Sequence, residues 1–135
     1  MKNNQFAVAV HILSLLQISP GASSEWIAAS VNTNAVVIRR ISSKLKKAGL
    51  IQAKAGVRGF RLAKEASDIT LLDIYKAIYV EEQTLSIHEH TNQKCVVGAN
   101  IQQALTASFT AAQQALETQL ASETLAQLTE NLLQQ

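Results

Sequence analysis

The fold is decided by residues 23–49, SSEWIAASVNTNAVVIRRISSKLKKAG, which hold two helical patterns joined by a polar turn. Ser23 or Ser24 can cap the first, short helix. The turn is Asn-Thr-Asn at residues 32–34, where asparagine tolerates left-handed backbone and can cap the helix that follows. A longer second helix is predicted over residues 35–48, because it has an apolar stripe at helical spacing and a glycine at its end.

Further elements are predicted on both sides of this stretch. Apolar residues recur at helical spacing over residues 6–16, before Ser-Pro-Gly ends that helix. Residues 50–63, LIQAKAGVRGFRLA, are typical of two short strands around a glycine-containing loop. A helix over residues 71–80 and a long helix over residues 99–121 follow, with an irregular stretch between them. Ser122 is expected to cap a last helix.

The charge is divided unevenly along the chain. Residues 1–64 carry ten cations and one acid, a net +9, whereas residues 65–135 carry a net −7. The formal total of +2 conceals both halves. A basic surface on one part and an acidic surface on another indicate a polyanion-binding module joined to a part that does not bind polyanions.

A capped helix, a turn, a basic helix and a basic hairpin, in this order, are the parts of a winged helix-turn-helix. The predicted fold class is mainly α with a small β wing: a winged helix-turn-helix DNA-binding domain plus a long C-terminal dimerisation helix. We expect the DNA-binding domain over residues 1–66, a connecting helix and sensor-like loop over 67–98, and a helical dimerisation region over 99–135. The basic helix would enter the major groove, and the wing would contact the backbone or the minor groove. The residues expected to contact double-stranded DNA are Asn34, Val36, Val37, Arg39, Arg40, Lys44, Lys54, Arg58 and Arg61.

The long C-terminal helix has an apolar seam whose members are three or four residues apart, a pattern typical of paired helices. Alanines beside the seam would allow a second helix to approach closely. The seam therefore predicts a homodimer. Its members, the expected dimer interface, are Ile101, Leu105, Phe109, Ala112, Leu116 and Leu120.

Cys95 is the only cysteine, so no intrachain disulfide is possible. It follows a lysine and precedes a predicted helix, and both features favour the thiolate. Two hypotheses stand: a redox switch whose oxidation changes the loop, or a small, partly buried apolar residue. The neighbouring His88, Glu89 and His90 match no zinc-binding spacing, so no metal site is expected.

Several other classes of protein are disfavoured. No set of nucleophile, base and orienting residue indicates an enzyme. His11 is expected to be a packing residue of the first helix whose polar atoms have partners, and Trp26 to be the core anchor of its helix. The N-terminus does not resemble a signal peptide, and no apolar run reaches the roughly 18 residues of a membrane span. The sequence therefore predicts a soluble cytoplasmic protein without membrane contact.

Five strings of residues cover most of the chain in a recognisable order. They are FAVAVHIL (6–13), LKKAGLI (45–51), GVRGFRLA (56–63), ITLLDIY (69–75) and CVVGANI (95–101). Their sequences and order resemble the Rrf2 family of bacterial transcription regulators, which includes the iron–sulfur regulator IscR, the nitric-oxide sensor NsrR and the cysteine-metabolism repressor CymR. The turn at residues 31–34 is most similar to the YwnA-like branch.

The resemblance implies a homodimer built on the long C-terminal helix, in which each protomer reads half of a near-palindromic operator. Cluster-binding members carry three cysteines around the loop before this helix. Only Cys95 matches one of them, so no cofactor is expected. The wing also departs from the family pattern, since Ala55 stands where an arginine is frequent and Arg58-Gly59 replaces a Gly-Gly pair.

The predicted function is therefore a homodimeric DNA-binding transcription regulator, a repressor, which is redox-responsive if the switch hypothesis for Cys95 holds. The alternative is a protein-binding adaptor that uses the winged helix as a scaffold. The excess of cations in the first half of the chain argues against the adaptor, because protein interfaces are depleted in lysine. The operator and the inducing signal are not defined by the sequence.

Overall fold

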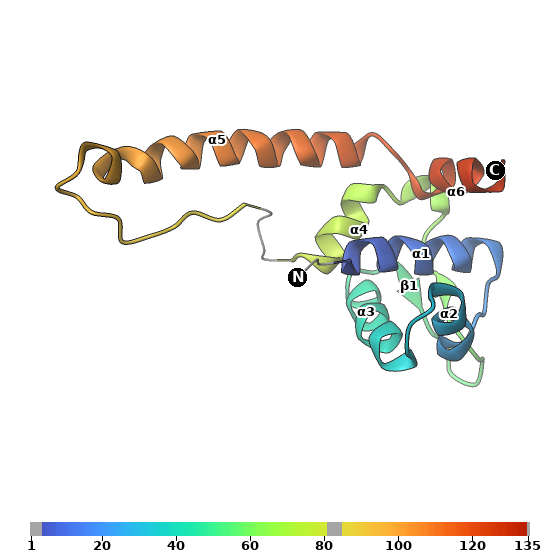
Figure 1. Ribbon diagram of the computed structural model, residues 1–135. Coiled ribbons are helices and arrows are strands. Elements are labelled where there is room, and N and C mark those ends of the chain that lie inside the picture. Colours follow the sequence, from blue (N-terminus) through green and yellow to red (C-terminus); the bar gives the residue numbers. More distant parts are fainter. Residues whose placement is uncertain (1–3, 81–84, 135) are drawn as a thin grey trace.

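The computed structural model describes residues 4–80 and 85–134 and confirms a mainly helical fold with one two-stranded sheet (Figure 1). Lys2 and the pair Glu81 and Glu82, which contribute to the charge pattern, lie outside the described residues. The elements, in chain order, are α1 (Gln5–Ile18), α2 (Ser24–Val31), α3 (Ala35–Lys47), β1 (Ile51–Gln52), β2 (Arg61–Leu62), η1 (Ala66–Asp68), α4 (Leu71–Ile78), α5 (Val96–Ala121) and α6 (Leu125–Leu133).

The first three helices enclose a common apolar core. α2 begins after Ser23, whose hydroxyl accepts a hydrogen bond from the Trp26 N–H at 3.2 Å. It ends at Asn32, which adopts a left-handed φ of 64°, as the turn sequence predicts. The largest fully buried side chains in this core are Ile12, Leu13 and Leu16 of α1, Ile27 of α2, and Ile38, Ile41 and Leu45 of α3. Burying each such side chain contributes roughly 1.5–3 kcal/mol to folding.

The wing is the hairpin of β1 and β2, which pair antiparallel with Ile51 opposite Leu62. Its base is attached to the turn between α1 and α2 through Phe60. The Phe60 carbonyl accepts a hydrogen bond from the Gly21 N–H at 2.9 Å, and the Phe60 N–H donates to the Ala22 carbonyl at 3.2 Å. These backbone contacts fix the wing beside the start of α2.

Gly59 is required for this attachment. Its φ is 79°, in the region that favours glycine. A Cβ added at Gly59 would also collide with the carbonyl oxygen of Gly21. Gly56, in the loop of the wing, has a similar φ of 77° but open space around it. The two wing glycines thus share a positive φ, but only Gly59 lies close to the backbone of Gly21.

α4 and α6 cover the side of the core away from the wing. Thr70 and Asp73 form a capping box at the start of α4, in which each side chain accepts a hydrogen bond from the other residue's backbone N–H. α6 packs against α1 and η1 and is joined to the start of α4 by a hydrogen bond from the Leu125 N–H to the Ile69 carbonyl at 2.7 Å. Leu125 is fully buried, so the last helix contributes to the same core.

The prediction that Ser122 caps α6 was wrong. Ser122 ends α5, and the N-cap of α6 is Thr124, which forms a capping box with Gln127. A Thr-x-x-Gln string before an apolar residue is a stronger start signal than a lone serine, because it satisfies two backbone N–H groups at once.

α5 differs from the other helices. It begins at Val96, three residues earlier than predicted, and none of its 26 residues is buried. Its C-terminal half lies along α4, where Lys76 Nζ is 3.9 Å from Glu117 Oε1. Its N-terminal half extends beyond the rest of the described chain, next to residues 85–94 (Figure 1). Neither α5 nor any other described helix is long and apolar enough to cross a membrane.

Candidate nucleic-acid interface

α3 has one buried side and one exposed side. The predicted stripe faces the core through Ile38, Ile41 and Leu45, which are all buried. Arg39 and Arg40 are exposed, and Val36 is 57% exposed one turn before them. Val37 is half-buried and lies between the two sides. Because residues three and four apart share a helix face, Val36 and the two arginines form one solvent-facing edge.

Asn34 caps α3, as the sequence indicates. Its Oδ1 accepts a hydrogen bond from the Val37 N–H at 3.0 Å. A bidentate contact with adenine uses both the carbonyl oxygen and the amide nitrogen of asparagine. Since Oδ1 accepts the capping hydrogen bond, only the Nδ2 amide of Asn34 can donate to a base or a phosphate.

The cations of α3 and the wing make no salt bridge with the acids in residues 4–80 and 85–134. Nine cations lie between Arg39 and Lys64, and none of them makes a salt bridge with another residue that the structure describes. Lys44 is half-buried and donates to Gln5 Oε1 at 3.0 Å, whereas the other eight are exposed. Exposed cations that no salt bridge neutralises create a positive potential that attracts a polyanion such as the phosphate backbone of DNA.

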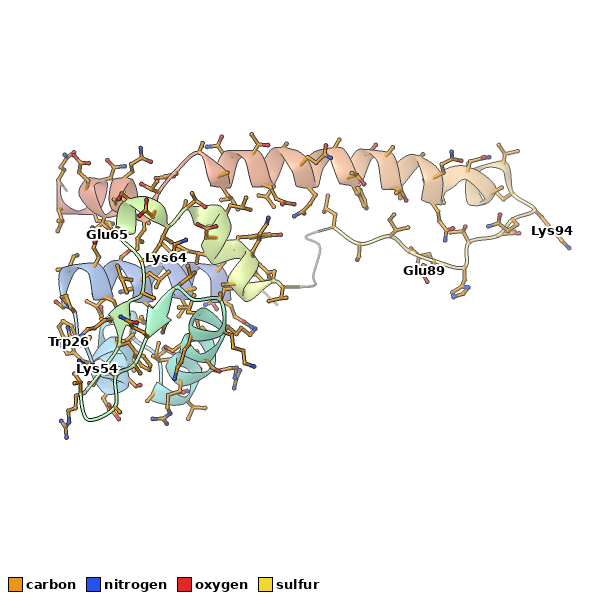
Figure 2. The ribbon with its side chains drawn as sticks, turned by 180° about the vertical axis from the view of Figure 1, so that it is seen from behind. Trp26, Lys54, Lys64, Glu65, Glu89 and Lys94 are labelled. Carbon is orange, nitrogen blue, oxygen red and sulfur yellow. The ribbon has the colours of Figure 1, made fainter. Side chains whose placement is uncertain are left out.

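The wing brings three of the predicted contacts together. Lys54 and Arg58 are exposed on the loop between β1 and β2. Arg61 lies on β2 with its guanidinium close to Gly21, where an added Cβ would be 3.3 Å from Nη2. Figure 2 shows Lys54 on the part of the domain that lies away from α5. The wing and α3 therefore share the basic part of the molecule.

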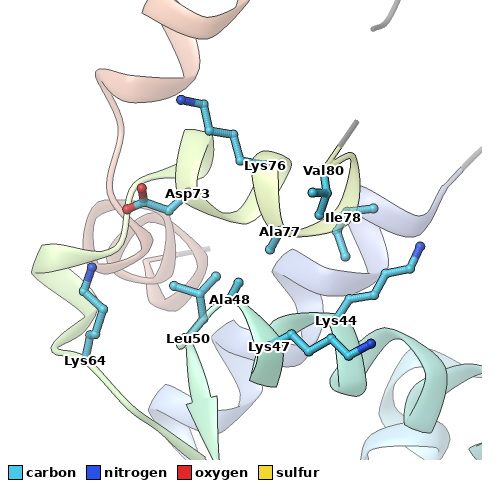
Figure 3. A pocket seen from close by; sticks show the side chains of 10 residues that line it. All are labelled: Lys44, Lys47, Ala48, Leu50, Lys64, Asp73, Lys76, Ala77, Ile78 and Val80. Atoms are coloured by element: carbon cyan, nitrogen blue, oxygen red, sulfur yellow. The ribbon is translucent and has the colours of Figure 1, made fainter. Parts of the chain in front are cut away.

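A basic hollow of about 1030 Å³ separates α3 and β1 from α4 (Figure 3). Four lysines surround an apolar floor that includes Ala48 and Ala77; they are Lys44, Lys47, Lys64 and Lys76. Lys44 and Lys76 have partners in Gln5 and Glu117. Lys47 and Lys64 have no partner among the described residues, so they extend the basic surface beyond the predicted contacts.

The prediction that Trp26 is a core anchor was wrong, and His11 has the expected polar partner but is exposed. Trp26 is 48% exposed, whereas the adjacent Ile27 is fully buried. Trp26 and Arg58 of the wing both line a small hollow at the turn between α1 and α2. His11 is exposed, with its Nε2 3.0 Å from Ser30 Oγ. Sequence reasoning therefore missed an exposed tryptophan beside the wing.

The predicted dimer seam runs along α5 and has no buried member. Ile101, Leu105, Phe109, Leu116 and Leu120 are half-buried, and Ala112 is exposed. Part of their surface is covered by α4 and by the segment before α5. The three- and four-residue spacing places these side chains along one side of the helix.

Cys95 is exposed and is the N-cap residue of α5. The hypothesis of a partly buried packing residue is therefore wrong. The backbone N–H groups of Gly98 and Val97 lower the pKa of the Cys95 thiol, although the geometry falls short of a full capping hydrogen bond. The loop is tight: the Cys95 N–H donates to the Asn92 carbonyl at 3.2 Å, and a Cβ on Gly98 would collide with the same oxygen.

The side chains around Cys95 do not fit an iron–sulfur cluster or a zinc ion. Clusters are held by several thiolates, and this chain has one. Within residues 4–80 and 85–134, no group of three His, Cys, Asp or Glu side chains is placed to hold a metal ion. His88 and His90 are both exposed.

The chain is similar to known transcription regulators over nearly its whole length. The Rrf2 family, described as an iron-dependent transcriptional regulator, matches residues 2–131. The Bacillus subtilis (strain 168) protein "Putative HTH-type transcriptional regulator YwnA" is 49% identical over 125 residues, which are 93% of this chain and 94% of that protein.

Solved structures share the architecture. One described as a "putative DNA binding protein" is 44% identical with a TM-score of 0.76, covering 92% of this chain and 97% of its own. A "putative transcriptional regulator" from Lactobacillus plantarum is 27% identical with a TM-score of 0.81, covering 96% and 89%. CymR of B. subtilis, 21% identical with a TM-score of 0.71 and 96% coverage of both chains, shares the fold. The chain thus belongs to the Rrf2 family and is a DNA-binding transcription regulator with a winged helix-turn-helix.

Proposed function

We propose that this protein is a homodimeric repressor that binds a near-palindromic operator through α3 and the wing of each protomer. The observation that carries the proposal is the set of nine cations, from Arg39 to Lys64, that have no salt-bridge partner in the described chain. A dimer bound at a promoter occupies DNA that RNA polymerase needs, which is the reason to propose repression.

The exposed edge of α3 supplies the base contacts. The Val36 methyl groups suit the methyl group of thymine, and Arg39 and Arg40 suit guanine or phosphate. Val37 and the Nδ2 amide of Asn34 lie at the start of the same helix. The contacts assigned to the phosphate backbone are those of Lys44, Lys54, Arg58 and Arg61. Because each phosphate contact releases counterions, affinity should fall steeply with salt concentration.

α5 supplies the dimer interface. A helix of 26 residues with none buried gains little from packing within its own protomer. Pairing two copies through the seam would remove its apolar side chains from water. Two linked winged domains can then occupy half-sites roughly 34 Å apart, or a multiple of that distance, along one face of the duplex.

Cys95 supplies the redox response in this proposal. Its exposed, stabilised thiolate attacks one oxygen of a peroxide; the O–O bond breaks, hydroxide leaves, and the cysteine becomes a sulfenic acid. The neutral sulfenic acid lacks the thiolate charge that the backbone N–H groups of Val97 and Gly98 stabilise, so we propose that oxidation weakens these interactions and shifts the start of α5. We propose that this changes the relative orientation of the two winged domains, without an iron–sulfur cluster or another cofactor.

The adaptor alternative has no specific observation in its favour. The most exposed side of α3 carries Arg39 and Arg40, and the wing is basic. Such a surface suits phosphates better than a typical protein partner.

The function is tested by titrating a labelled duplex from the protein's own promoter region and following anisotropy at several salt concentrations. We expect tight binding that weakens with salt, and about tenfold weaker binding for Arg39→Gln and for Arg40→Gln. Lys94→Gln, which removes a cation far from α3, is the matched control. Salt-independent binding, or both arginine variants binding like the unaltered protein, would refute the assignment.

The redox response is tested in the same titration after treatment with peroxide. The unaltered protein should lose operator affinity and regain it on reduction, whereas Cys95→Ser should be unaffected. Because the chain has no other cysteine, an equal loss in Cys95→Ser would assign the response to another residue.

A further inference from the structure

We propose that Trp26 of α2 and Arg58 of the wing form a second DNA contact site, which binds one backbone phosphate and its sugar outside the major groove. The inference rests on the proposed DNA-binding function and adds to it a residue that belongs to neither α3 nor the wing.

Trp26 is unusual in its surroundings. It is the only tryptophan of the chain and is 48% exposed, although it follows the N-cap of a helix that buries its next residue. Its indole N–H, a donor without acceptor capacity, has no hydrogen-bond partner among the residues that the structure describes. An aromatic ring with one free donor suits a surface that is partly apolar and partly anionic.

The site has two walls from distant parts of the sequence. Trp26 and Arg58 line a hollow of about 370 Å³ together with the turn from Ser19 to Ser23. Arg58 also lines a second hollow beside it, with Ser24 and Val57. The start of α2 and the loop of the wing are therefore neighbours, and the Arg58 guanidinium makes no salt bridge with a described acid.

The two walls are held at a fixed separation. Arg58 precedes Gly59, whose close approach to Gly21 and whose neighbour Phe60 attach the wing to the turn before α2. Trp26 is fixed from the other side by the Ser23 cap. A ligand would therefore cost little ordering of the backbone, which favours binding.

The chemistry of the site favours a phosphodiester. The indole N–H can donate to one phosphate oxygen, Arg58 can neutralise the charge, and the ring can cover the adjacent deoxyribose. Glu25 lies in the neighbouring hollow and would repel a more highly charged anion. Arg61, beside Gly21, adds a second cation near the same turn.

The place of the site also suits duplex DNA. Figure 1 shows α2, α3 and the wing together on the part of the molecule that lies away from α5 and α6. Figure 2 shows Trp26 at the outer edge of this domain, at the end away from Lys94. A phosphate contact there would fix the register of α3 in the groove without reading sequence.

The test uses Trp26 as its own reporter. The full-length protein is titrated with a fluorescein-labelled promoter duplex; anisotropy measures binding, and tryptophan fluorescence with acrylamide measures access to Trp26. At saturation we expect Trp26 to be strongly protected from acrylamide. The fluorescence belongs to this residue alone, because the chain has one tryptophan.

Substitutions distinguish a direct contact between Trp26 and DNA from simple shielding of the ring by bound DNA. Trp26→Phe keeps the ring but lacks the N–H, and we expect it to bind the operator and unrelated duplexes weaker by a similar factor, on the order of tenfold. Arg58→Gln should reduce the slope of log affinity against log salt concentration by about one ion. The variant with both substitutions should lose less DNA affinity than the product of the two single-variant factors. Lys94→Gln is the control, and circular dichroism checks that each variant is folded.

Each outcome is decisive. Protection of Trp26 together with weaker binding by Trp26→Phe supports the site. Unchanged acrylamide access at saturation overturns it, as does protection with unchanged affinity of Trp26→Phe, while DNA binding by the protein stands. If the unaltered protein binds no DNA, the proposed function and this inference both fail.

Discussion

The winged domain and α5 differ in where their stabilising contacts come from. Buried side chains from α1, α2, α3, α4 and α6 form one core, whereas α5 buries none of its 26 residues. The winged domain can therefore fold through contacts within one chain. α5 carries an apolar seam whose surface is only partly covered by its own protomer. The stability of the winged domain and the stability of α5 should therefore respond to different mutations. Only the stability of α5 should depend on protein concentration.

The largest effect is expected when the seam is made acidic. Leu105→Glu combined with Phe109→Glu would place four carboxylates in one dimer interface, so dimerisation should be lost and operator affinity should fall by at least a hundredfold. Gln103→Glu with Thr110→Glu adds the same charge on exposed positions of α5. Light scattering measures dimerisation of both variants, and DNA titration measures their operator affinity. The control variant should keep both. A dimer that survives the seam change would remove α5 from the interface.

The core of the winged domain provides the opposite test. Leu45 is fully buried on α3, so Leu45→Ala should reduce the free energy of unfolding by about 2–5 kcal/mol. The loss should be the same at low and high protein concentration in urea titrations. Leu133→Ala, at a residue that is 69% exposed, should change stability by less than about 0.5 kcal/mol. Equal effects of the two changes would contradict the core described for α3.

The wing glycines give an intermediate effect with a matched control. Gly59→Ala and Gly56→Ala both place a side chain at positive φ, but only the first collides with Gly21. The strain alone costs roughly 1–2 kcal/mol. Gly59→Ala should additionally displace the wing and weaken DNA binding severalfold beyond Gly56→Ala. If the two variants bind DNA equally, the attachment of the wing does not matter for binding.

The smallest effect concerns Cys95. Backbone N–H groups at the start of α5 stabilise its thiolate and lower its pKa, so the folded protein should react with iodoacetamide at lower pH than the urea-unfolded chain. The rate should rise through the lowered pKa and level off above it. A folded-state midpoint at or above that of the unfolded chain would show that the N-cap position has no influence on the thiol.

Local signals predicted the winged domain well. Ser23 and Asn34 cap their helices as expected, because a short polar side chain before an apolar repeat satisfies backbone groups within three residues. The hairpin follows from two apolar–polar alternations around glycines, and the observed pairing of Ile51 with Leu62 fits it. These features depend on contacts that are close in sequence.

Some predictions failed although a local signal was present, and others failed because the neighbours come from distant parts of the chain. Trp26 was placed in the core because of its size, yet in α2 it lies on the same side as Ser30, while Ile27 and Val31 face inward. Helical spacing alone could have found this. The shared hollow of Trp26 and Arg58 could not be predicted, since it depends on how the wing folds back on the turn before α2. The Asn34 cap, likewise, limits a base contact that residue type alone favours.

The central claim is that two chains joined through α5 place two basic winged domains on one stretch of DNA. The most direct measurement is the mass of the complex with a promoter duplex, determined by light scattering during size-exclusion chromatography. The account predicts two chains on each duplex, with one chain or none for the acidic seam variant. A single unaltered chain that holds the duplex with full affinity would contradict it.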